Sequence, residues 1–184
     1  MTTWLGKLVA HIHPHQRPDT LPGPLQSVVN RFFDEPSRPQ KGKQPELVLL
    51  YGCVCSGKTT YRRTHRASGY VALDAGDVFA EMGYGDADPF PAADPVGMNQ
   101  IGCAIARRAL RKQRSLVLEL VSNFPEQLDK VLAAIQLRGY LSKVTVFDCT
   151  PEDAARRNQG RGAYAISVYH AQRFHVEWLL FATK

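Results

Sequence analysis

The chain has 184 residues, 44% of them hydrophobic and 22% charged, a balance that predicts a folded domain with a core and excludes a largely disordered chain. The net charge of +6 favours an anionic ligand, with a small phosphate-bearing molecule ahead of a nucleic acid. The cysteines lack disulfide or zinc spacing, and no targeting segment or apolar run of membrane-spanning length is visible, so we expect a cytoplasmic protein with no membrane partner.

Residues 1–45 differ in composition from the rest and are expected to form an N-terminal extension. Apolar side chains recur at helical spacing over residues 24–33 and predict a short amphipathic helix. A polar, Pro-rich segment over residues 34–45 then predicts a linker. We expect the apolar face of the helix to pack on the main domain, as such faces generally do, with docking of a protein partner as the alternative.

Residues 46–184 alternate between strand and helix patterns and are expected to form the main domain. The unbroken apolar run at residues 47–51 is typical of a buried parallel strand. Further strands are expected at residues 70–73, 115–120 and 143–147, and helices at residues 58–67, 96–113, 125–138, from 151 onward and 165–181. This alternation predicts a three-layer α/β fold with a parallel sheet.

A phosphate-binding motif of the form G-x-x-x-x-G-K-[ST] lies between the first predicted strand and the following helix. Backbone N–H groups of such a loop face the phosphates of a nucleotide, and its glycines allow close approach. We expect Lys58 to reach the β- and γ-phosphates of ATP and the Thr59 hydroxyl to bind Mg²⁺. The motif in this context predicts a P-loop NTPase fold. The residues expected to hold ATP are Gly52, Cys53, Val54, Cys55, Ser56, Gly57, Lys58, Thr59 and Thr60.

Three acidic residues follow the second and third predicted strands. Asp74 and Asp77 lie where the second strand ends, at the mouth of an open α/β sheet. One of these carboxylates is expected to hold Mg²⁺ through water, and the other to accept a proton from a substrate hydroxyl; a plain turn is the alternative. Glu119 ends the third strand, where a second metal or substrate contact is expected.

Three arginines, Arg156, Arg157 and Arg161, follow the fourth predicted strand. Arg157 and Arg161 share one face if the helix that begins at residue 151 continues. Guanidinium groups suit phosphate oxygens, and two nearby glycines suit a lid that closes over the nucleotide. We therefore expect a lid that contacts ATP, with a solvated basic helix face as the alternative.

The order of these parts resembles the small-molecule P-loop kinases, most closely the zeta-toxin group, over residues 46–175. Besides the motifs above, the Leu-Arg-Gly-Tyr sequence at residues 137–140 is similar to that group. The resemblance implies an enzyme that transfers the ATP γ-phosphate to a hydroxyl, which in zeta toxins belongs to a UDP-linked amino sugar. It also implies an antitoxin that blocks the ATP site.

The same resemblance assigns a role to each candidate residue. Asp77 becomes the general base, while Lys58 and the lid arginines stabilise the charge of the transferred group. The implied catalytic residues are Lys58, Asp77, Arg157 and Arg161; the metal ligands are Thr59 and Asp74; the substrate contacts are Asp77 and Glu119; and Arg156 is a further ATP contact.

Two other functions fit the same motifs. A polynucleotide 5′-hydroxyl kinase would use the same loop and base, and the basic charge would suit a single-stranded substrate. A non-catalytic ATP-binding regulatory module would instead use the helix at residues 24–33 for docking. A GTPase is not expected, because no Asp-x-x-Gly follows the third strand and no Asn-Lys-x-Asp occurs later. The main hypothesis remains a kinase acting on the hydroxyl of a small molecule that the sequence does not name.

Overall fold

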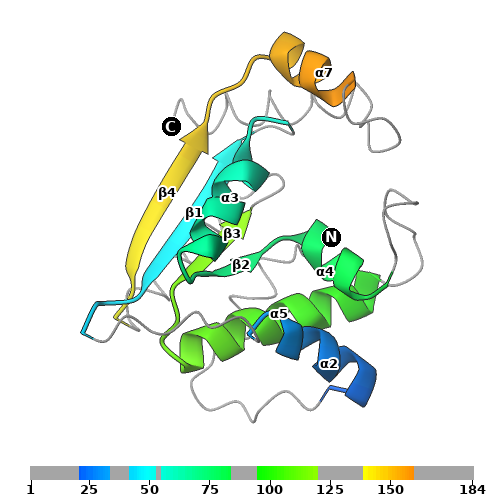
Figure 1. The fold of residues 1–184 in the computed structure, drawn as a ribbon, viewed down its shortest axis with the longest axis vertical. Helices are drawn as coiled ribbons and strands as arrows, with labels where there is room; N and C mark the ends of the chain where they lie inside the picture. Colours follow the sequence, from blue (N-terminus) through cyan, green and yellow to red (C-terminus); the bar gives the residue numbers. More distant parts are fainter. Residues whose placement is uncertain (1–20, 34–41, 53–54, 84–94, 120–138, 160–184) are drawn as a thin grey trace.

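The computed structural model describes residues 21–33, 42–52, 55–83, 95–119 and 139–159, which form a parallel sheet flanked by helices (Figure 1). The elements in chain order are α2 (Gly23–Arg31), β1 (Glu46–Gly52), α3 (Lys58–Ala67), β2 (Val71–Leu73), α4 (Ala75–Glu81), α5 (Pro95–Arg111), β3 (Leu116–Glu119), β4 (Leu141–Phe147) and α7 (Pro151–Gln159). The helices expected at residues 125–138 and 165–181 lie outside the described residues. Within the described ranges, no helix has the length and apolarity that crossing a membrane requires.

The described strands lie in the order β2-β3-β1-β4, and each neighbouring pair is parallel. β1 therefore lies inside the sheet, between β3 and β4. Its register pairs Leu50 with Glu119 at the end of β3, and Gly52 with Phe147 at the end of β4. The carboxyl ends of these strands thus meet at one edge of the sheet, where ligands bind in open α/β folds.

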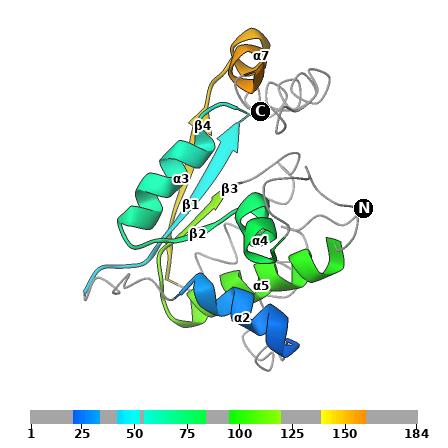
Figure 2. The same cartoon turned by 45° about the vertical axis from the view of Figure 1, so that its right-hand side comes forward.

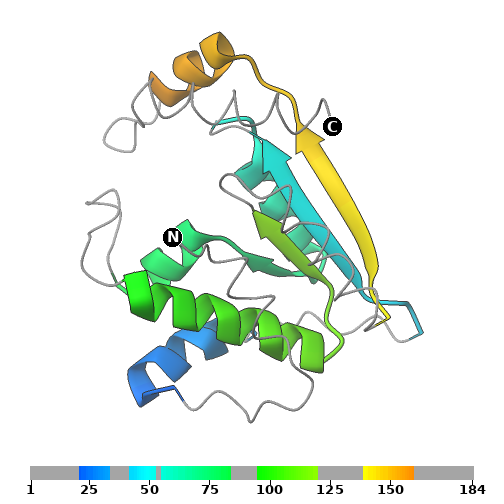
Figure 3. The same cartoon turned by 180° about the vertical axis from the view of Figure 1, so that it is seen from behind.

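Alternate residues of β1 contribute to the cores on the two faces of the sheet. Leu47 and Leu49 belong to a large core shared with α2, α4 and α5, whereas Val48 and Leu50 belong to a smaller core that packs against Tyr61 of α3. Figure 2 shows α3 on one side of the sheet and α5 with α2 on the other, and Figure 3 shows the face that α5 covers. β1 is thus buried on both faces, as a central parallel strand must be.

The predicted three-layer α/β fold with a parallel sheet is confirmed. The predicted helix at residues 58–67 is α3, with the same bounds, and the apolar run at residues 47–51 is β1. The predicted helix at residues 96–113 is α5, although it ends two residues earlier, at Arg111. β4 begins at Leu141, two residues before the predicted strand at residues 143–147.

One described helix, α4, was not predicted. Asp74 was placed at the end of a strand, but its side chain accepts a hydrogen bond from the Gly76 backbone N–H at 3.2 Å and caps α4. Asp77 consequently lies in the first turn of that helix. Its seven residues are too few to show a helical repeat in sequence, and burial of Val78 and Phe79 against the main core stabilises it.

The predicted helix at residues 24–33 is confirmed as α2, and it packs on the main domain. Val28 and Val29 are buried in the core that includes α5. Arg108 of α5 donates to Asn30 Oδ1 at 2.6 Å, and its guanidinium carbon lies 4.5 Å from the centre of the Phe33 ring. Docking of a protein partner by this helix stays a prediction.

Replacing Val29 with alanine is expected to lower the free energy of unfolding by about 2 kcal/mol, because its deep burial means that the lost methyl groups leave a cavity. Urea unfolding followed by circular dichroism measures the change. Ser27→Ala, on the exposed side of α2, is the matched control and should change the free energy by less than about 0.5 kcal/mol. Equal, small effects of the two substitutions would contradict the packing of α2 on the core.

Candidate functional site

The phosphate loop leads directly into α3. Gly57 is the N-cap residue of this helix and has a φ angle of 105°, which side chains disfavour. Glycine has no side chain to cap the helix, so the N-terminus of α3 suits an anionic ligand. A helix N-terminus also favours negative charge through its dipole.

Gly52 lies so close to β4 that any side chain would collide with it. A Cβ atom at this position would lie 2.6 Å from the Phe147 carbonyl oxygen and 3.0 Å from Ser56 Oγ. The carbonyl belongs to the backbone of the neighbouring strand and cannot rotate away. Glycine at this position therefore keeps the start of the loop tight against the sheet.

Two polar side chains of the loop are buried. The Lys58 ammonium, on a side chain only 4% exposed, donates to the Gly52 carbonyl oxygen at 2.8 Å. The Ser56 hydroxyl is buried and has no hydrogen-bond partner among the described residues. A buried ammonium and an unpaired hydroxyl beside a helix N-terminus suit phosphate oxygens, so the loop fits the phosphates of a nucleotide.

One turn further along α3, Arg62 contacts all three acidic residues predicted for the site. Its side chain is 2% exposed. Nε donates to Glu119 Oε2 at 3.0 Å, and Nη2 donates to Asp74 Oδ2 at 3.3 Å. The Asp77 carboxylate accepts from both Nη1 and Nη2. The structure thus brings Asp74, Asp77 and Glu119 together, and a buried guanidinium joins them.

Arg62 was not predicted as a site residue, because arginines in helices are usually exposed. The available signal was its spacing: Arg62 follows Lys58 by four residues and so lies on the same side of α3. Arg66 lies on that side as well, so the spacing alone does not single out Arg62. What distinguishes Arg62 is the set of acids that the neighbouring elements bring to it.

Glu119 also contacts the phosphate loop. The Thr59 hydroxyl donates to the Glu119 carboxylate at 3.2 Å, and the Lys58 ammonium lies 4.0 Å from Oε1 of the same group. The sequence assigned Asp74 to Mg²⁺ together with Thr59, and Glu119 to a second metal or substrate contact. The structure places Glu119 beside Thr59, while Asp74 caps α4.

The acidic side chains differ in how open they are to solvent. Asp77 is 29% exposed, whereas Asp74 is 16% and Glu119 only 9% exposed. Asp77 is therefore the carboxylate of this cluster that a substrate can reach most easily. Glu119 is instead enclosed between the loop and α3.

Thr59 and Glu119 are described residues that could hold a metal ion together with a bound nucleotide. Within the described part of the chain, no three His, Cys, Asp or Glu side chains gather in an arrangement that could hold a metal. Mg²⁺ in nucleotide sites takes one or two protein ligands and completes its shell with phosphate oxygens and water. Thr59 and Glu119 offer the oxygen ligands that such a site needs, so the residues present fit a magnesium–nucleotide complex.

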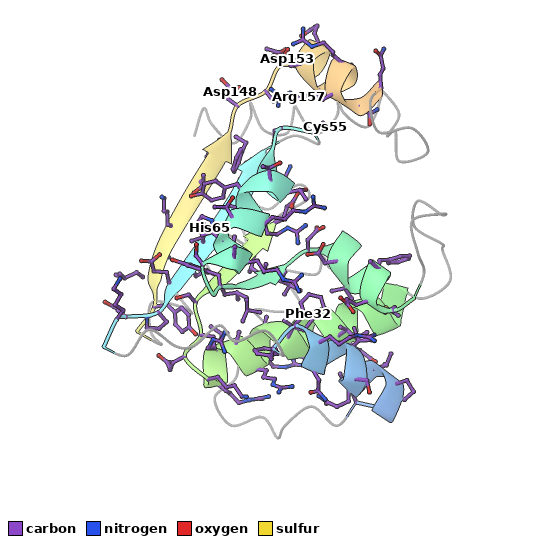
Figure 4. The ribbon with its side chains drawn as sticks, in the orientation of Figure 1. Phe32, Cys55, His65, Asp148, Asp153 and Arg157 are labelled. Atoms are coloured by element: carbon purple, nitrogen blue, oxygen red, sulfur yellow. The ribbon has the colours of Figure 1, made fainter. Side chains whose placement is uncertain are left out.

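The helix α7, which follows β4, contacts the phosphate loop (Figure 4). Arg157 Nη1 donates to the Cys55 carbonyl oxygen at 3.2 Å and lies 3.8 Å from Cys149 Sγ. Cys55 has a φ angle of 64°, which is uncommon for a residue with a side chain, and its thiol lies 3.9 Å from Asn158 Oδ1. Arg157 thus lies next to the loop, and its predicted contact with ATP stays a prediction.

For the remaining predicted site residues, contact with ATP stays a prediction. Arg156 is exposed and pairs with Asp153 on its own helix. Thr60 is exposed on α3, and its carbonyl oxygen accepts a hydrogen bond from Thr64. Three further predicted site residues, Cys53, Val54 and Arg161, lie outside the described residues.

A glycine-lined phosphate loop at the edge of a parallel sheet, with a β3 carboxylate beside the loop threonine, defines a P-loop NTPase-like nucleotide-binding domain. The chain belongs to the family described as AAA domain, whose model matches residues 47–178, more than half of the chain. The match begins in β1 and leaves out α2. No curated protein and no solved structure matches the chain. The finer resemblance to the zeta-toxin group stays a prediction.

Replacing Gly52 with alanine is expected to weaken nucleotide binding by at least about tenfold, equivalent to ~1.4 kcal/mol, because the new Cβ would push the loop away from Phe147. Titration calorimetry with ATP measures the affinity. Gly23→Ala is the matched control, since a Cβ there meets no atom within 4 Å. Unchanged affinity in Gly52→Ala would show that the close contact with β4 does not shape the binding loop.

Proposed function

We propose that this protein is an ATP-dependent phosphotransferase that moves the γ-phosphate to a hydroxyl of a small molecule. The observation that carries the proposal is the position of Asp77. This carboxylate is the most exposed of the acids bound to Arg62, which itself follows the phosphate-loop lysine by one turn of α3. A loop for phosphates beside an accessible base is what transfer to a hydroxyl requires.

Different residues at the loop would bind the phosphates and the metal ion. The Lys58 ammonium is already inside the loop, where it would contact the β- and γ-phosphates. Thr59 and Glu119 would hold Mg²⁺, directly or through water, which neutralises charge on the phosphates when bound. Buried as it is, Glu119 is better suited to this role than to contact with the acceptor.

The proposed transfer is a single in-line displacement. Asp77 accepts the proton of the acceptor hydroxyl while the hydroxyl oxygen forms a bond to the γ-phosphorus. The bond from the γ-phosphorus to the bridging oxygen breaks, and ADP leaves with its electron pair. The bonds from Arg62 occupy only part of the lone-pair capacity of the Asp77 carboxylate, so the substrate hydroxyl still finds an acceptor site.

The acceptor is proposed from the resemblance and from the charge of the chain. The resemblance to zeta toxins makes a nucleotide sugar the first acceptor to test, and the basic charge makes a polynucleotide the second. Arg157, which reaches the loop from α7, is the described arginine best placed to stabilise the transferred phosphoryl group.

Lys58→Ala is expected to reduce phosphotransfer by about a hundredfold or more, because the ammonium that would meet the transferring charge is lost. The measurement is the transfer of label from the γ-position of ATP. Arg63→Ala removes an exposed cation from the same helix and should leave the rate unchanged. Retained turnover in Lys58→Ala would overturn the proposed kinase activity.

Asp77→Asn is expected to separate binding from chemistry. The amide cannot accept the substrate proton, so transfer should fall by roughly 10²- to 10⁴-fold while ATP affinity changes little. Calorimetry gives the affinity and a labelled-product assay gives the rate. Full activity of the variant would remove Asp77 from the reaction.

The acceptor is identified with γ-labelled ATP and a panel of nucleotide sugars, sugars, nucleosides and an oligonucleotide with a free 5′-hydroxyl. A labelled small molecule, identified by mass, supports the proposal. Label on the oligonucleotide alone would make the protein a polynucleotide kinase. ATP binding with no labelled product from any acceptor would favour a non-catalytic module.

A further inference from the structure

The strongest unassigned feature of the molecule is the buried guanidinium of Arg62. Each of its three nitrogens donates to a carboxylate: Nε to Glu119, Nη1 to Asp77, and Nη2 to both Asp74 and Asp77. Burying a charge is unfavourable unless it is paired and hydrogen-bonded. The packing of α3 against these acids supplies four such hydrogen bonds.

The guanidinium connects the carboxylate beside the phosphate loop, Glu119, with the proposed base, Asp77. At one end of the guanidinium, Nε donates a hydrogen bond to Glu119. Glu119 also accepts a hydrogen bond from the Thr59 hydroxyl of the phosphate loop. On the other side, Nη1 and Nη2 form a two-pronged contact with Asp77. Because the guanidinium is planar and rigid, it fixes the separation of these two carboxylates.

Arg62 also offsets part of the negative charge of the three carboxylates. The groups that face one another are three carboxylates (Asp74 and Asp77 at the start of α4, and Glu119 at the end of β3) and two cations of α3, Lys58 and Arg62. Counted over these five described side chains, the negative charges exceed the positive ones by one. An excess of that sign attracts a divalent cation without the strong repulsion that unpaired carboxylates would suffer.

We propose that Arg62 is a positioning residue that holds the base Asp77 and the metal-side carboxylate Glu119 at a fixed separation. This inference rests on the proposed function for the role of Asp77, but not for that of Glu119. Asp74 is the third carboxylate that binds the guanidinium. It caps α4 and accepts a hydrogen bond from Nη2, so it holds the first turn of α4, which contains Asp77, next to Arg62. Arg62 itself acts through these acids and does not touch the transferred phosphate.

Arg62→Lys is the sharpest test, because it keeps the positive charge and removes the planar fork. A lysine cannot bond Glu119 and Asp77 with fixed geometry, so we expect kcat to fall by about a hundredfold with KM for ATP within about threefold. We also expect the variant to lose most of the gain in ATP affinity that Mg²⁺ gives the wild type. Arg63→Lys, an exposed neighbour on α3, should leave every one of these values unchanged.

A double-variant comparison with Glu119 distinguishes positioning by Arg62 from a role in fold stability alone. The gain in ATP affinity on adding Mg²⁺ is measured by calorimetry in Arg62→Lys, in Glu119→Gln and in the double variant. If Arg62 acts through Glu119, the double variant should be no worse than Glu119→Gln alone. Independent losses that add in the double variant would overturn the proposal, and so would an Arg62→Lys variant with wild-type kcat and Mg²⁺ dependence.

The binding measurement separates this inference from the proposed function. If the wild type transfers label to no acceptor, the kinase proposal fails, yet the Mg²⁺ dependence of ATP binding in Arg62→Lys still supports or overturns the role of Arg62 toward Glu119. Should Arg62→Lys unfold in thermal melts, Asp74→Asn removes one anchor of the guanidinium instead. A lower kcat at unchanged KM, or a smaller Mg²⁺ gain, then supports the proposal, and wild-type values of both overturn it.

Discussion

The burial of Arg62 is the constraint on which the arrangement of the site depends. A guanidinium that is 2% exposed has lost its hydration, and carboxylates must replace the water. Those carboxylates come from the start of α4 and from the end of β3, which are far apart in the chain. The sheet order, with β3 between β2 and β1, brings both to the same turn of α3. The site therefore forms only when the sheet and its helices pack correctly.

The central position of β1 explains why the phosphate loop has two different sides. On the β3 side, the loop threonine meets Glu119 and, through it, the Arg62 cluster. On the β4 side, Gly52 lies against the backbone of Phe147, and α7 reaches the loop through Arg157. One side thus supplies acids that suit a metal and a base, and the other supplies close packing and a cation. Both sides suit a magnesium–nucleotide complex.

Much of this arrangement could be predicted from the sequence. The phosphate loop, the bounds of α3 and the gathering of Asp74, Asp77 and Glu119 follow from local motifs and from the rule that parallel strands end at one edge. The helix α4 could not be predicted, because its cap and its buried face make sense only against the packed core. Arg62 was missed for the same reason, since its burial depends on partners from other elements. The partnership of Thr59 with Glu119 follows from the strand order, which no local pattern encodes.

The loop and its neighbouring acids form a site that suits the phosphates of a nucleotide. Titration calorimetry of the full chain with ATP, ADP and AMP in the presence of Mg²⁺ checks this assignment. ATP and ADP are expected to bind, and AMP to bind far more weakly, because the phosphates beyond the first make most of the contacts with the loop. AMP binding as tightly as ATP, or no binding of any of the three, would show that the assignment is wrong.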